Sequence, residues 1–156
     1  MTLARGGFGL DGWAPREEHT VACWQLPSES TAAATARAIT LRTLRRWRVP
    51  ATADCDDIVL MVDELVANAV LHGYGPIGLR LTIDSAVGGA LVRCEVSDAS
   101  TIVPRPCDPA ADAESGRGLL LVTALAAEFG VRPGGFGKVV WFTRKLAARP
   151  AAAPLP

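Results

Sequence analysis

Three polar residues, Glu64, Asn68 and His72, are spaced four apart in a largely apolar stretch, so on a helix they form one stripe. Spacing alone leaves two interpretations open: the stripe is a hydrogen-bonded helix face, or it carries chemistry. In the second case the carboxamide oxygen of Asn68 suits Mg²⁺, which takes few protein oxygens and completes its shell with phosphates and water. Glu64, one turn earlier, would accept a proton from a nucleophile that attacks phosphorus beside that metal.

Two further segments have residue types that bind ligands, and each also has a purely structural explanation. Asp98 follows an alternating apolar segment, where its carboxylate either opens a turn or accepts a hydrogen bond from the amino group of a base. Gly116, Arg117 and Gly118 precede an apolar run. Glycines there form either a hinge or an anion site, because the first backbone N–H groups of a helix are unpaired and face a phosphate. No Walker lysine or GxGxxG motif accompanies them.

The elements that must position these residues follow from apolar periodicity and turn residues. Strands are predicted at residues 19–26, 79–83, 90–96, 131–132 and 138–144, and helices at residues 28–47, 54–72 and 119–129. Ser28 and Asp54 are the predicted caps of the first two helices, and Gly130 is predicted to end the third. Residues 101–115, which hold prolines and show no period, are predicted to be a long loop of the kind that usually serves a function in a compact domain.

The first predicted helix has one apolar and one basic face. Its inner face is predicted to use four residues, namely Ala34, Ala38, Leu41 and Leu44. Five arginines crowd the rest of the segment, at positions 37, 42, 45, 46 and 48. A basic run of this kind is either a solvated face or a surface that docks a partner, and both interpretations stay open.

Composition describes one ordinary domain. The 156 residues hold 16 Lys+Arg against 16 Asp+Glu and are 49% hydrophobic. Proteins that bind nucleic acid through its phosphates usually carry an excess of basic residues, and this chain has a net charge of zero. No direct nucleic-acid partner is therefore expected. No segment has the length and hydrophobicity of a membrane span or signal peptide, so a cytoplasmic protein without membrane contact is expected. Residues 1–18 are predicted to be a flexible arm, 19–146 one domain, and 147–156 a flexible tail.

Four segments together resemble a known family. Residues 64–73, with the sequence ELVANAVLHG, resemble the asparagine box of the ATPase superfamily that includes gyrase, the ninety-kilodalton heat-shock chaperones, histidine kinases and mismatch-repair proteins. Asp98 with Ser100 resembles the adenine-contacting box, residues 114–119 the second glycine box, and residues 137–142 the terminal strand. Within the superfamily, the short chain is similar to the bacterial anti-sigma-factor serine kinases and their small ATP-binding relatives.

This resemblance, which runs from His19 to Arg144, implies a fold and a site. The fold would be α+β, a two-layer α/β sandwich of the Bergerat ATP-binding type, with three helices on one face of a mixed, mostly antiparallel sheet. ATP and Mg²⁺ are the implied cofactors, and residues 101–115 would be a lid that becomes ordered when nucleotide binds. Asn68 would hold Mg²⁺ and Glu64 would be the catalytic base. The implied nucleotide-binding residues are Asn68, His72, Gly73, Asp98, Ser100, Gly116, Arg117, Gly118 and Leu119, of which Asp98 would bind the adenine amino group and residues 116–118 the phosphates.

The leading hypothesis is an ATP-binding regulator that binds a sigma factor as an anti-sigma factor and phosphorylates a serine of an antagonist protein. The second is a non-catalytic module that keeps the fold and acts by sequestering a partner. Glu64 favours the first, whereas the absence of both glycines of the usual DxGxG adenine box favours the second. A metabolic ATP-dependent enzyme is a third hypothesis, disfavoured because no second domain would bind a small substrate. The resemblance also implies a homodimer. The acceptor-only carboxylate of Asp98 predicts a preference for adenine over guanine.

Overall fold

The computed structural model describes residues 18–86, 89–102 and 117–147. Most of the predicted arm, lid and tail, together with Gly116, lies outside these residues. The described elements are, in chain order, β1 (Glu18–Leu26), α1 (Ala32–Arg46), α2 (Thr52–His72), β2 (Ile77–Ala86), β3 (Gly89–Asp98), α3 (Arg117–Leu125), β4 (Glu128–Pro133) and β5 (Lys138–Leu146).

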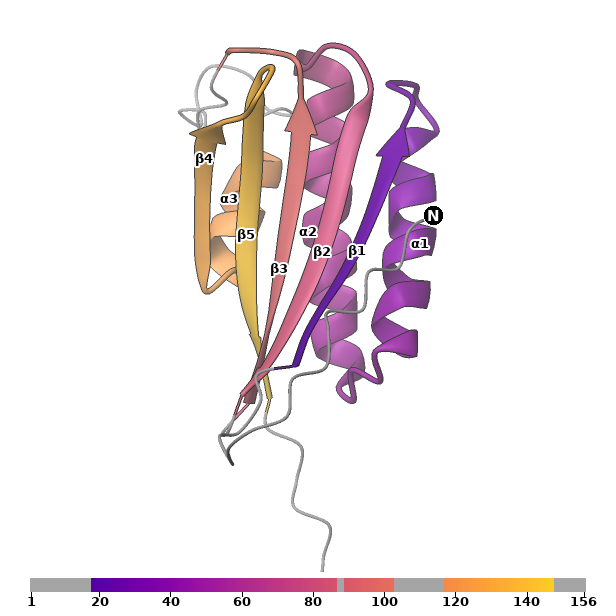
Figure 1. The fold of residues 1–156 in the computed structure, drawn as a ribbon, viewed down its shortest axis with the longest axis vertical. Helices are drawn as coiled ribbons and strands as arrows, with labels where there is room; N and C mark the ends of the chain where they lie inside the picture. Colours follow the sequence, from indigo (N-terminus) through magenta and orange to yellow (C-terminus); the bar gives the residue numbers. More distant parts are fainter. Residues whose placement is uncertain (1–17, 87–88, 103–116, 148–156) are drawn as a thin grey trace, which may run out of the picture.

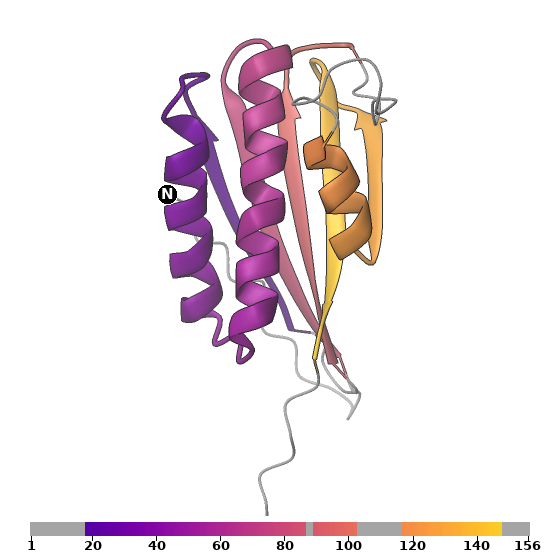
Figure 2. The ribbon, with the colours of Figure 1, turned by 180° about the vertical axis from the view of Figure 1, so that it is seen from behind.

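The strands form one sheet in the order β1-β2-β3-β5-β4. All three described helices cover one face of it, with α2 in the middle, as Figures 1 and 2 show from opposite sides. The predicted α+β sandwich is therefore confirmed. The sheet is less mixed than expected, because each pairing between the described strands is antiparallel.

Alternation along the strands divides the sheet into an apolar and a polar face. On β2 and β3 the side chains that point toward the helices are buried, including Leu79, Leu81 and Val92. The other face carries charge: the Arg93 guanidinium lies 4.4 Å from the Trp141 ring centroid, and Arg132 forms an ion pair of 2.7 Å with Glu95. The core thus lies between the sheet and the helices.

Helix α2 is the central element of that core. Its apolar residues recur at helical spacing, and Ile58, Met61, Val62 and Val66 are fully buried. The predicted end of this helix at His72, with Gly73 following, is confirmed. The predicted cap at Asp54 is wrong, because the helix begins at Thr52 after Ala51.

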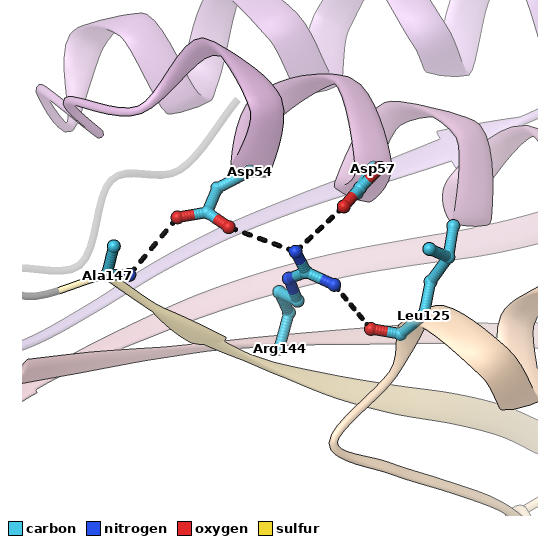
Figure 3. A network of polar contacts seen from close by, with 5 residues as sticks. All are labelled: Asp54, Asp57, Leu125, Arg144 and Ala147. Carbon is cyan, nitrogen blue, oxygen red and sulfur yellow. Dashed lines mark hydrogen bonds and ion pairs between the residues drawn. The ribbon is translucent and has the colours of Figure 1, made fainter.

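Asp54 instead belongs to a polar network that joins three elements (Figure 3). Its carboxylate accepts hydrogen bonds from Arg144 and from the Ala147 backbone, both at 3.1 Å. Arg144 also donates to Asp57 at 2.7 Å and to the Leu125 carbonyl at 2.6 Å. The network therefore fastens the start of α2, the end of α3 and the end of β5 to one another.

Helix α1 begins at Ala32 rather than at the predicted Ser28 cap, because the residues before it form a turn in which Glu29 N donates to Pro27 O. The predicted inner face is also wrong in part. Ala34 and Ala38 are exposed, whereas the larger Ile39 and Leu44 are buried. Leu44 is thus the one predicted inner residue of this helix that is fully enclosed.

The predicted helix to Phe129 is wrong in its last turn: α3 ends at Leu125, and Phe129 and Gly130 lie in β4. Gly130 packs on the Trp141 ring, since a Cβ there would lie 2.7 Å from Trp141 Cζ2. Glycine at this position therefore permits close strand packing and does not end a helix. Across the described residues, no helix has the length and apolar character needed to cross a membrane.

Candidate functional site

Four segments meet around the second half of α2: the start of α3, the end of β3, the turn after α2 and the turn before β5. Glycines make the close approaches possible. Gly118 lies against Glu64, Gly73 lies against Asp98, and Gly137 lies against the backbone of Asp98 and Ala99. The predicted site residues of α2 and β3 are thereby brought to one end of the sandwich.

The first of these contacts places the start of α3 on the Glu64 carboxylate. A Cβ at Gly118 would overlap Glu64 Oε2, so only glycine leaves that oxygen in place. Burial raises the pKa of Glu64 above its usual value, and the nearby charge of Asp63 raises this pKa further. A carboxyl with a raised pKa is better matched to proton abstraction near neutral pH.

One turn further along α2, Asn68 has an unpaired polar atom. Its Nδ2 is buried and has no hydrogen-bond partner among the described residues. An unsatisfied buried amide costs free energy, so the position fits a polar ligand. A half-turn of the amide would present the oxygen in the same direction. Such an oxygen is a ligand that Mg²⁺ accepts, and the Glu64 carboxylate lies one turn away on the same helix.

Asp98 is held by two donors at the end of β3. Its Oδ1 accepts a hydrogen bond of 2.7 Å from the Ser100 backbone N–H, and Lys138 Nζ lies 3.0 Å from each carboxylate oxygen. Asp98 is 7% exposed, Ser100 2% and Lys138 6%. The predicted adenine-contacting residues are therefore together, and Lys138 joins them.

Two turns hold the segment that follows Asp98. Ala99 N donates to Tyr74 O at 2.9 Å, which ties it to the turn after α2. On the other side a Cβ at Gly137 would lie 2.6 Å from Ala99 Cα, so the turn before β5 packs on this backbone. Gly73 completes the enclosure, because a Cβ there would lie 2.7 Å from Asp98 Cγ. Asp98 thus has a fixed orientation.

The remaining predicted residues are placed less directly. His72 is exposed at the end of α2 and Arg117 is exposed at the start of α3. Leu119 is 2% exposed within the core, so only its backbone could face a ligand. Gly116 lies outside the described residues. Lys138 was missed by sequence reasoning, although it is one of only two lysines in the chain and follows the last glycine of the site.

A protein family and a solved structure are similar to this chain. No curated protein matches the chain. The histidine kinase domain of the blue-light activated histidine kinase from Erythrobacter litoralis is 30% identical, with a TM-score of 0.42, over 60% of this chain and 45% of that chain. A family model described as the histidine kinase-like ATPase domain matches residues 26–144, which include every described element of the site. The chain therefore belongs to the histidine kinase-like ATPase domain family.

Proposed function

We propose that this protein binds ATP with Mg²⁺ and acts as an anti-sigma factor that phosphorylates a serine of an antagonist protein. Membership of the family supports nucleotide binding. The form of residues 64–73, which resembles the anti-sigma-factor serine kinases, supports the narrower assignment. A sigma factor, its antagonist and a second copy of this chain are the proposed partners.

The observation that carries this proposal is the contact between Gly118 and Glu64, one turn from the unpaired amide of Asn68. It brings a helix N-terminus, which favours phosphate, to a carboxylate with a raised pKa. Bound Mg²⁺ would neutralise charge on the phosphates during transfer. Glu64 would accept the proton of the attacking serine hydroxyl, Asn68 would hold the metal, and the backbone at the start of α3 would orient the transferred group.

Calorimetric titration of the purified protein with ATP, with and without Mg²⁺, tests the first step. ATP binding that strengthens with Mg²⁺ is expected, and no detectable ATP binding would contradict the proposal. Transfer of labelled phosphate from ATP to a protein that co-purifies with the chain tests the second step. Label on a serine of that partner is expected, whereas labelling that is unaffected by Glu64→Ala would assign it to another kinase.

A non-catalytic module that sequesters its partner is the second candidate, and one observation favours it. The positions of the two adenine-box glycines are occupied by Ser100 and Ile102. Partner binding that does not respond to ATP, combined with the absence of any phosphotransfer, would favour this module over the kinase.

A further inference from the structure

Lys138 and Asp98 form a buried ion pair whose position the sheet dictates. The two residues are register partners in the antiparallel pairing of β3 with β5, so their side chains lie on the same face of the sheet. The side chains are 7% and 2% exposed. An ammonium group has three N–H donors, and the two carboxylate oxygens take at most two of them, so at least one donor remains.

Stability alone does not account for this pair. Burying two charges costs several kcal/mol of desolvation, and replacing such a pair by apolar side chains of similar size is often neutral or stabilising. β3 and β5 are already joined by nine register pairs, from Ala90 with Leu146 to Asp98 with Lys138. The Asp98–Lys138 pair is the last of these nine register pairs. It lies next to Ser100 and Gly73, where the Asp98 carboxylate is expected to contact the base of a nucleotide.

The chemistry of the pair matches the edge of a purine. A carboxylate is an acceptor and an ammonium is a donor, and here the two are adjacent. Adenine presents the complementary adjacent groups, with the exocyclic amino group as donor and ring nitrogen N1 as acceptor. Both polar atoms of this edge would then be paired on burial, which an isolated carboxylate cannot achieve.

We propose that Lys138 is a nucleotide-binding residue that donates to N1 of adenine while Asp98 accepts from the amino group. This assignment rests on the proposed binding of ATP and names the residues that read its base. It also adds a second group to the expected basis of base recognition, which was the Asp98 carboxylate alone. A lone carboxylate would repel the guanine carbonyl oxygen, whereas the ammonium beside it offsets that repulsion, so recognition depends on N1 more than on exclusion of guanine.

The experiment compares the affinity of ATP with that of 1-deaza-ATP, in which a C–H group replaces N1. Calorimetry with the wild-type protein is expected to show that ATP binds about 10- to 100-fold more tightly, the value of a hydrogen bond from a charged donor. In Lys138→Met the two nucleotides should bind within about twofold of each other. Lys145→Met, which alters the other lysine of β5, should keep the wild-type ratio.

A second variant keeps the test decisive if Lys138→Met does not fold. Asp98→Asn combined with Lys138→Met removes both charges together, and it should also bind the two nucleotides equally. A wild-type-like ratio in either folded variant would overturn the role of Lys138 and leave ATP binding standing. Equal affinity of the wild-type protein for both nucleotides would do the same. No ATP binding by the wild-type protein would instead overturn the proposed function, and base reading with it.

Discussion

Gly118, in the first turn of α3, lies so close to the Glu64 carboxylate of α2 that a Cβ in its place would overlap Oε2. The two residues are far apart in the chain and belong to different helices. Their contact fixes the distance between the end of α3 that would face phosphate and the group that would take the proton. The proposed catalytic arrangement therefore depends on a packing contact between two helices.

Replacing Glu64 by Ala should reduce phosphoryl transfer by about 10²- to 10⁴-fold, the usual contribution of a general base. ATP affinity should change little, because the carboxylate does not contact the phosphates in the proposed arrangement. Single-turnover transfer and calorimetric ATP titration measure the two quantities separately. Glu128→Ala, at an exposed position of β4, is the matched control. Equal loss of binding and transfer in Glu64→Ala would contradict the role of a base.

As the pH is lowered, phosphoryl transfer should be lost at a higher pH than it would be if Glu64 had the pKa of an ordinary carboxyl. Burial and then the charge of Asp63 raise the pKa of Glu64, and the base is active only when it is deprotonated. The rate is therefore lost as pH falls through this raised pKa. Asp63→Asn removes one of the two causes, so it should move the midpoint of the pH–rate profile to lower pH. An unchanged midpoint in Asp63→Asn would mean that the profile reports another group.

Asn68→Ala should abolish the Mg²⁺ dependence of ATP binding while leaving the fold intact. The amide nitrogen has no partner among the described residues, so its removal breaks no hydrogen bond. Its loss should change the free energy of unfolding by no more than about 1 kcal/mol, because the amide left unpaired was itself a cost. Urea unfolding and calorimetry with and without Mg²⁺ check both statements. Asn68→Asp, which keeps an oxygen ligand, should retain Mg²⁺ dependence.

Asp98→Asn should destabilise the protein by roughly 3–5 kcal/mol, because it leaves the buried Lys138 ammonium without a counter-charge. Adding Lys138→Met should restore most of the lost stability, since neither residue is then charged. Urea unfolding of the two single variants and the double variant gives the coupling between them. An additive double variant would show that the ion pair contributes nothing to the fold.

Gly137→Ala should destabilise the protein by about 1–3 kcal/mol, because the added Cβ would overlap Asp98 O and lie 2.6 Å from Ala99 Cα. Gly135→Ala is a close control in the same turn, where a Cβ would meet nothing within 4 Å. In thermal unfolding, Gly137→Ala should therefore have a clearly lower melting temperature than Gly135→Ala. Similar melting temperatures would show that the turn before β5 can shift at no cost.

Local sequence patterns were sufficient to predict the central helix of the fold. Helix α2 keeps apolar spacing over 21 residues, so both its course and its end at His72 could be predicted. The same spacing placed Glu64 and Asn68 one turn apart on the helix. The positions of most strands followed from alternation and turn residues, whereas the sandwich was implied by the resemblance of four segments to a known family.

Features that depend on distant partners could not be predicted. The Asp98–Lys138 pair joins residues 40 positions apart, and strand register alone brings them together. Asp54 has the residue type of a helix cap, but Arg144 and Ala147 bind it from the other end of the domain. Gly130 has the residue type of a helix end, but glycine is required at this position because a Cβ would overlap the Trp141 ring. In each case a tertiary contact overrides a sound local rule.

The Arg144 network holds one end of α3, and the other end of this helix lies at the candidate site. Arg144 holds the Leu125 carbonyl at 2.6 Å, and the Ala127 N–H donates to Thr143 O at 2.7 Å, so the carboxyl end of the helix is anchored to β5. The helix has nine residues and is therefore about 13 Å long. A tilt of about 10° at the anchored end would displace Arg117 by roughly 2 Å. A displacement of this size would change the contact between Gly118 and Glu64, so the hydrogen bonds that anchor one end of α3 also restrain the geometry of the candidate site at its other end.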